Sequence, residues 1–169
     1  DAQLSVFDDE NRFVCCETTK RAGKTTVAVA KCFESMLKNP DTRYAYIGLT
    51  RTSAEGIAWP IIRQMDRDLD LCGVLTEGKL RYVMPNGSEL SLHGADQANW
   101  MTRLYGQKLG GIVIDEADFY TISLSKFFNE TLVHNVRDLR GFVWYLSTPG
   151  ETLSGMFYEI MTGQIKGWS

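Results

Sequence analysis

Cysteine and histidine are scarce in this sequence, and the few that occur are not grouped. The 169 residues include four cysteines, none in a C-x-x-C pair, and two isolated histidines, His93 and His134. Zinc sites and disulfide frameworks need such residues at close, regular spacings. The scarcity argues against a zinc centre, and Cys15 and Cys16 are expected to act as small buried hydrophobes in an apolar run. We therefore expect a protein of a reducing, intracellular compartment.

Long apolar runs and an excess of one charge are also missing. No stretch approaches the ~20 apolar residues that span a bilayer, and no signal-peptide pattern is present, so we expect a soluble protein with no membrane partner. The net charge of −3 gives no overall basic field for nucleic acid, although a local stripe of lysine and arginine would still grip DNA. The chain has no repeat or linker, which favours one domain over residues 1–169. Because it begins with Asp1, we expect a domain excised from a longer protein.

Short apolar runs alternate with helix-forming segments along the whole chain. Strands are predicted over residues 12–17, 43–49, 80–84, 89–93, 111–115 and 142–146. Helices are predicted over residues 24–37, 50–71, 95–105, 123–136 and 154–161. The alternation predicts an α/β fold with a mainly parallel central sheet flanked by helices.

Two local signals refine this arrangement. Asn86-Gly87 separates two alternating runs and predicts a β-hairpin insertion near residues 80–93. Pro60 follows Trp59 inside the second helical segment, which we expect to be broken or restarted there, because proline removes a helical hydrogen bond.

Residues 17–26, ETTKRAGKTT, join the first predicted strand to a helix that begins near Gly23 or Lys24. At a helix N-terminus, unpaired N–H groups and the positive end of the dipole favour an anion. Gly23 lets the backbone approach a ligand, Lys24 adds a positive charge, and the Thr25 hydroxyl is suited to Mg²⁺. The pattern matches a Walker A loop except that Thr18 replaces the first glycine. Taken alone, Gly-Lys-Thr also fits an ordinary loop-to-helix junction.

A second candidate element is the carboxylate pair Asp115-Glu116, which ends the apolar strand at 111–115. Ligands of open α/β sheets bind at the carboxyl ends of the strands, where the phosphate loop also lies. Asp115 is predicted to complete an Mg²⁺ shell opposite Thr25, and Glu116 to orient and deprotonate an attacking water. The alternative is a capping pair before a solvated loop. Together with the glycine-lysine-threonine turn, the pair favours nucleotide hydrolysis.

Ser147-Thr148-Pro149 ends the neighbouring predicted strand at 142–146. Hydroxyl groups at this position are suited to hydrogen-bond a γ-phosphate or the attacking water, and to report its loss. A plain exit from strand to turn, with proline as the terminator, is the alternative interpretation.

The ordered set of these motifs resembles the ATPase domain of phage large terminase subunits, the motors that package DNA. The residues that carry the resemblance are Gln3, 20–25, 50–52, 57–59, 94–96, 104–106, 110–112, 115–116 and 147–149. The resemblance implies a RecA-like (ASCE) P-loop NTPase fold over residues 1–169. In the family a nuclease domain generally follows the ATPase, and this chain ends at Ser169, so we expect no nuclease activity.

The resemblance also implies roles for single residues. Glu116 would be catalytic together with Lys24, Thr25 and Asp115 would bind Mg²⁺, and Gln3 would read the adenine. The remaining nucleotide-binding residues would be Thr19, Lys20, Arg21, Ala22, Gly23, Lys24, Thr25, Thr26, Ser147 and Thr148, the last two coupling hydrolysis to movement.

One residue that the resemblance leads us to expect, a trans-acting arginine, is not at its usual position. Tyr105 stands where relatives often carry an arginine that acts on a neighbouring subunit's nucleotide. Arg103 is our candidate for this trans-acting arginine, and Arg140 is the second candidate.

The implied function is hydrolysis of ATP with Mg²⁺ to drive double-stranded DNA into a procapsid in the host cytoplasm. The implied partners are DNA, a homo-oligomeric ring that is a pentamer by family resemblance, a portal protein and the small terminase subunit. Two alternatives stay open. Residues 115–118 spell DEAD, as in a superfamily 2 helicase-like RecA domain. Thr18 instead suggests a non-catalytic nucleotide-binding assembly module.

Overall fold

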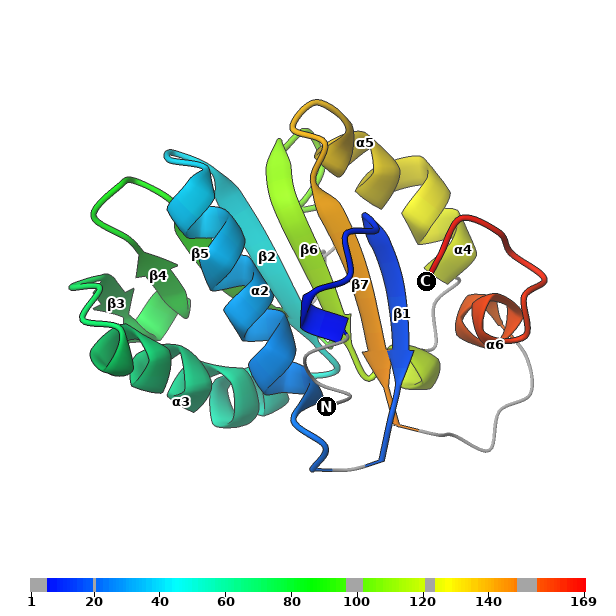
Figure 1. Cartoon of the computed structure of the whole chain (residues 1–169), viewed down its shortest axis with the longest axis horizontal. Helices are drawn as coiled ribbons and strands as arrows, with labels where there is room; N and C mark the ends of the chain where they lie inside the picture. Colours follow the sequence, from blue (N-terminus) through cyan, green and yellow to red (C-terminus); the bar gives the residue numbers. More distant parts are fainter. Residues whose placement is uncertain (1–5, 20, 97–101, 121–123, 149–154) are drawn as a thin grey trace.

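The computed structural model describes residues 6–19, 21–96, 102–120, 124–148 and 155–169, and its core is one sheet (Figure 1). In the described chain the sheet has seven strands in the order β1-β7-β6-β2-β5-β4-β3. Their bounds are β1 Phe13–Glu17, β2 Arg43–Gly48, β3 Val74–Thr76, β4 Arg81–Val83, β5 Glu89–Gly94, β6 Leu109–Asp115 and β7 Phe142–Ser147.

The first five strands of this order run parallel, and β5, β4 and β3 pair antiparallel at the far end. The mainly parallel sheet and the hairpin near residues 80–93 are thus confirmed, and β5 belongs to both. Gly87, with φ of 84°, closes the hairpin in a backbone conformation that suits glycine. β3 was not predicted, because three residues with an exposed Val74 give no periodic signal.

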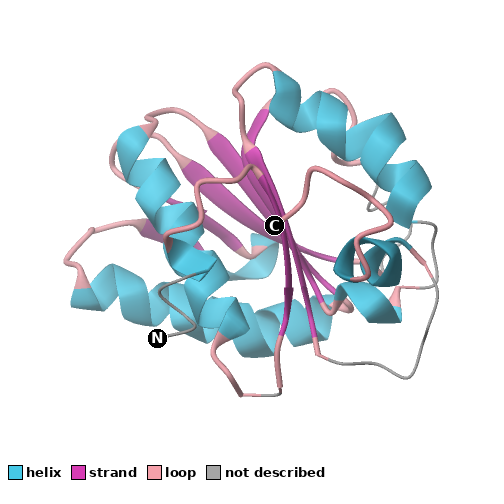
Figure 2. Cartoon of the chain, turned by 45° about the vertical axis from the view of Figure 1, so that its right-hand side comes forward, coloured by secondary structure: helices cyan, strands magenta, loops and turns pink. Residues whose placement is uncertain are grey.

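Helices cover both faces of the sheet (Figure 2). Their bounds are α2 Lys24–Lys38, α3 Arg51–Asp68, α4 Leu124–Phe127, α5 Val133–Arg137 and α6 Met156–Met161, with the short segments η1 Glu77–Lys79, η2 Ala117–Phe119 and η3 Phe128–Leu132.

Alternation along each strand divides the core in two. On β2, Tyr44 and Tyr46 pack into the cluster that includes α2 and α3, whereas Ala45 and Ile47 pack into the cluster that includes α5 and α6. Strands β6 and β7 are buried along their whole length, as expected for parallel strands covered on both faces.

The predicted break at Trp59-Pro60 is wrong, because α3 continues through Pro60. A proline in a helix interior removes one hydrogen bond and costs about 3 kcal/mol. Packing on both sides of it offsets this cost: Ala58, Trp59 and Ile62 are buried, and Trp59 Nε1 donates to Glu77 Oε2 at 2.7 Å. The tertiary contacts therefore override the local signal.

The predicted helix over 95–105 is also not observed in the residues that are described. Residues 95–96 and 102–106 form turns, and residues 97–101 lie outside the described part of the chain. The carbonyls of Leu104 and Gln107 accept hydrogen bonds from the buried Asn135 side chain, and the Leu104 carbonyl also accepts from Gln107 N at 3.2 Å in a turn. A long-range polar contact thus replaces the helical pattern at this end.

Candidate nucleotide-binding site

Three loops meet at the carboxyl edge of the sheet, after β1, β7 and β6. The parallel register aligns Glu17 with Ser147 and Leu146 with Asp115, so the three strands end at the same level. Thr18 N donates to Ser147 O at 3.2 Å, which joins the first two loops directly. Since β7 lies between β1 and β6, the phosphate-loop candidate and the carboxylate pair flank the hydroxyl pair.

The loop between β1 and α2 has the backbone shape of an anion-binding turn. Ala22 N donates to Thr19 O at 3.3 Å, and Arg21 and Gly23 adopt left-handed φ values of 66° and 84°. Gly23 directly precedes α2, whose first N–H groups have no partner within the helix. Thr18 is not among the residues with positive φ, so its backbone conformation does not require glycine. The departure from the glycine pattern is therefore compatible with this loop.

Lys24 and Thr26 lie in the first turn of α2, at the end of this loop. The Lys24 ammonium donates to the carbonyls of Thr18 and Thr19 at 3.1 and 3.4 Å, so it lies over the turn. Two predicted nucleotide-binding residues, Gln3 and Lys20, lie outside the described residues.

Thr25 and Asp115 come together as the sequence predicted. Thr25 Oγ1 donates to Asp115 Oδ2 at 3.1 Å, and Asp115 is only 6% exposed. Burial raises the pKa of the Asp115 carboxyl, while hydrogen bonds from Tyr46 and Thr25 oppose that rise. The Tyr46 contact was missed, because it depends on the strand order and not on any local motif.

Glu116 is held by Thr148, the residue that follows β7. Its Oε2 accepts from Thr148 Oγ1 at 3.0 Å and from Thr148 N at 3.4 Å. Ser147 Oγ in turn accepts from Asp118 N at 3.3 Å. Glu116 has a left-handed φ of 55°, which is unfavourable for a residue with a side chain and is typical of functional sites. The structure therefore links the candidate base by direct hydrogen bonds to Thr148, one of the two candidate coupling residues.

Neither candidate trans-acting arginine lies at this site. Arg103 lies in the turn at 102–106, near enough to His93 for its charge to lower the pKa of that imidazole, after the larger effect of burial. His93 is near the carboxyl end of β5, and β7, β6 and β2 separate that strand from β1. Arg140 precedes β7 and therefore lies at the opposite, amino edge of the sheet. The turn that carries Arg103 precedes the amino end of β6, and its Leu104 carbonyl accepts from Asn135 of α5, so this turn is held away from the phosphate loop.

A cavity of about 440 Å³ opens beside β1, next to the phosphate loop. Its lining is mainly apolar, which suits a flat group such as a nucleotide base. It is lined by Val6, Asp9, Val14, Cys15, Cys16, Glu17, Thr18, Ala22, Lys24, Val27, Leu146, Met161 and Ser169.

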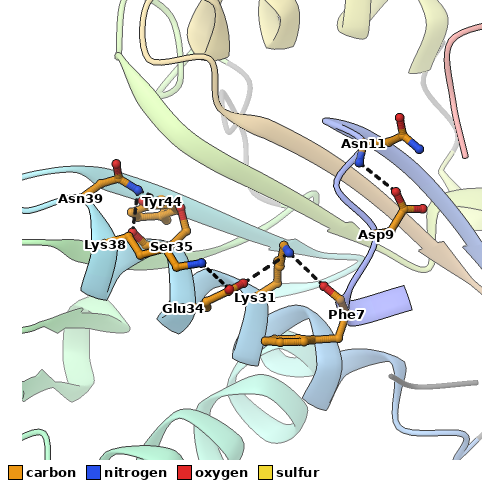
Figure 3. Close-up of polar contacts among 9 residues, drawn as sticks. All are labelled: Phe7, Asp9, Asn11, Lys31, Glu34, Ser35, Lys38, Asn39 and Tyr44. Carbon is orange, nitrogen blue, oxygen red and sulfur yellow. Dashed lines mark hydrogen bonds and ion pairs between the residues drawn. The ribbon is translucent and has the colours of Figure 1, made fainter. Parts of the chain in front are cut away.

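The chain that follows Gln3 is tied to α2 at one wall of this cavity. Lys31 Nζ donates to Phe7 O at 2.9 Å and lies 5.2 Å from the centre of the Phe7 ring (Figure 3). A cation over an aromatic face adds to the hydrogen bond. The segment that carries Val6 and Asp9 is therefore held against the helix that begins at the phosphate loop.

Comparisons with known proteins support this arrangement at the level of the fold. No family model and no curated protein sequence matches the chain. Among solved structures, the large terminase of a thermophilic bacteriophage has a TM-score of 0.81 at 16% identity, over 98% of this chain and 43% of that one. The Thermus phage P74-26 large terminase ATPase domain has a TM-score of 0.72 at 19% identity, over 94% and 67%.

A third match is the first of these terminases in complex with ATP-γ-S, with a TM-score of 0.65 at 17% identity, over 86% of this chain and 36% of that one. The chain thus spans less than half the length of that terminase in either structure. The fold is that of phage large terminase ATPase domains, which confirms the predicted fold class.

Proposed function

We propose that this chain, over residues 1–169, is the ATP-hydrolysing motor domain of a viral large terminase that moves double-stranded DNA into a procapsid. The observation that carries the proposal is the meeting of three loops at one sheet edge: the phosphate loop, Asp115-Glu116 and Ser147-Thr148. The shared fold with a terminase that binds ATP-γ-S supports it.

Thr25 and Asp115 fit an Mg²⁺ ion by the chemistry of their donor atoms. The Thr25 hydroxyl and the Asp115 carboxylate adjoin at the phosphate loop, with Thr25 Oγ1 3.1 Å from Oδ2, and both groups supply hard oxygen ligands. In the described part of the chain no three acidic, histidine or cysteine residues form a metal cluster. This suits Mg²⁺, which commonly takes one or two protein ligands together with substrate phosphates. When bound, the ion neutralises charge on the phosphates.

The chain's own residues supply the remaining steps. The free N–H groups at the start of α2 and the Lys24 ammonium hold the phosphates. Glu116 orients and deprotonates the attacking water. Thr148 holds one oxygen of this carboxylate, Oε2, and so connects the base to the residue that follows β7.

The position of Arg103 supports a ring. Its turn precedes the amino end of β6 and is held by Asn135 of α5, so Arg103 is not at the phosphate loop of its own subunit. In a ring, the surface of one subunit that carries this arginine faces the phosphate loop of the next subunit. The arginine then stabilises the charge of the transition state at that neighbouring site. We propose a homo-oligomeric ring, pentameric by resemblance, that acts on the portal with the small terminase subunit in the host cytoplasm.

The direct test compares ATP turnover and nucleotide binding in two variants. Glu116→Gln is expected to lose at least about 100-fold in turnover and to keep its affinity for a fluorescent ATP analogue, because it removes only the base. Lys24→Ala is expected to weaken both turnover and binding, because it removes a phosphate contact.

Glu55→Gln is the matched control, since Glu55 is exposed on α3, and it should behave as wild type. Wild-type turnover in Glu116→Gln and Lys24→Ala would contradict the assignment. Binding without any Glu116-dependent turnover would instead indicate a nucleotide-binding module.

A further inference from the structure

We infer that Tyr46 is a positioning residue for the carboxylate of Asp115, a role that rests on the proposed ATPase function. Tyr46 is 1% exposed, and its hydroxyl donates to Asp115 Oδ2. The same oxygen accepts from Thr25 Oγ1 at 3.1 Å, and Oδ1 accepts from the Glu116 backbone N at 3.0 Å. Both oxygens of Asp115 are therefore oriented by donors on three different segments of the chain.

The strand order brings Tyr46 to this carboxylate. β2 pairs with β6 in parallel, and Tyr46 lies opposite Val113, two residues before Asp115. Side chains alternate along a strand, so Val113 and Asp115 share one face of β6, and Tyr46 and Val113 pack in the same cluster. The long phenol ring spans the diagonal to the carboxylate. Because the ring is fully packed, its hydroxyl has a fixed position.

The Tyr46 hydroxyl occupies one of the lone-pair sites of the Asp115 carboxylate. A carboxylate offers about four acceptor sites, two on each oxygen. Thr25 and Tyr46 take both sites on Oδ2, and the Glu116 N–H takes one on Oδ1. One site on Oδ1 is left for a cation or for a water of its shell. Tyr46 is a neutral donor, so it orients Asp115 without competing with the cation for the negative charge.

Tyr46→Phe tests this role, because it removes the hydroxyl and keeps the buried ring. The measurement is the affinity for a fluorescent ADP analogue over a series of Mg²⁺ concentrations and in EDTA. Loss of a partner that orients a metal ligand typically costs 10–100-fold in metal affinity. We expect the Mg²⁺ concentration for half-maximal effect to rise about tenfold and the affinity in EDTA to stay unchanged.

Tyr44→Phe is the matched control. Tyr44 is on the same strand, packs in the same cluster and is fully buried, but its hydroxyl lies 2.8 Å from Ser35 Oγ (Figure 3). Tyr44 pairs with Gly111, four residues before Asp115. It should keep the wild-type Mg²⁺ dependence, and melting temperatures of both variants report any loss of folding.

Two outcomes would overturn the inference. If Tyr46→Phe and Tyr44→Phe both show the wild-type Mg²⁺ dependence, Tyr46 does not position the metal ligand, and the proposed ATPase function stands. If the wild-type chain binds the analogue with no Mg²⁺ dependence, the proposed function fails together with the inference. A raised Mg²⁺ requirement in Tyr46→Phe alone supports it, because a purely structural loss would change the affinity in EDTA as well.

Discussion

The two adjacent carboxylates at this edge, Asp115 and Glu116, have different hydrogen-bond partners. Thr148, which follows β7, holds the Glu116 carboxylate, while Tyr46 of β2 and Thr25 of α2 hold Asp115. Two adjacent acidic residues are thus oriented by different elements, which suits two different roles for them.

Thr148→Val tests the link to Glu116 with little change in side-chain volume. We expect ATP turnover to fall about tenfold, since a hydrogen bond to a charged group contributes about 1.5–3 kcal/mol, and nucleotide affinity to stay near wild type. Thr148→Ser keeps the hydroxyl and should retain most of the turnover. Equal turnover in the two variants would show that the hydroxyl is not needed.

The half-buried imidazole of His93 predicts a loss of stability in acid. Burial, and then the charges of Arg103 and Arg51, lower its pKa in the folded chain. The unfolded chain therefore takes up this proton at a higher pH than the folded chain. The stability due to neutral His93 is present above about pH 6.5 and is lost as the pH falls from there towards the folded pKa.

The measurement is the urea midpoint of wild type and His93→Gln at about pH 7.5 and about pH 5.5, on either side of the unfolded pKa. The midpoint should fall less on acidification in the variant than in wild type. An equal fall in both would mean that His93 does not contribute to the pH dependence.

The residues that could be predicted from sequence are those in local motifs. Gly23, Lys24 and Thr25 are adjacent in the chain, and their spacing alone indicates a phosphate loop. Tyr46 has no such signal, because its contact with Asp115 depends on which strand lies beside β6. The partner of Glu116 was unexpected for the same reason.

At the scale of elements, the parallel strands followed from buried apolar runs, and their bounds agree with the predicted ones to within two residues. α3 shows where local signals fail. Thr50 and Ser53 form the capping box that starts the helix, with hydrogen bonds of 3.0 Å in each direction, and Pro60 does not end it. Packing of Trp59 is a tertiary contact that no local window contains.

Pro60→Ala should stabilise the chain by about 2 kcal/mol, because it restores a helical N–H and loses only part of that gain through a more flexible unfolded state. Pro60 is exposed, so no cavity forms. Urea unfolding measures the change, with Glu55→Ala, an exposed position earlier on the same helix, as the control. An unchanged or lower midpoint in Pro60→Ala would show that α3 is shaped around the proline.

At the scale of the whole molecule, the loops of the candidate site and the candidate trans-acting arginine, Arg103, lie at separate places. The phosphate loop and Asp115-Glu116 lie around β1, β7 and β6, whereas the turn that carries Arg103 precedes the amino end of β6 and is held by Asn135 of α5. Arg103 is therefore not at the candidate site of its own subunit. The proposed ring would bring an arginine of a neighbouring subunit to each candidate site.

The central claim is tested most directly by steady-state ATP turnover per subunit as a function of protein concentration, with wild type and Glu116→Gln measured side by side. The account predicts that wild-type turnover per subunit rises steeply with concentration, because assembly brings a neighbour's arginine to each site, and that it is absent in Glu116→Gln. Wild-type turnover per subunit that is independent of concentration would contradict the shared site, and equal turnover in the two proteins would contradict the ATPase site itself.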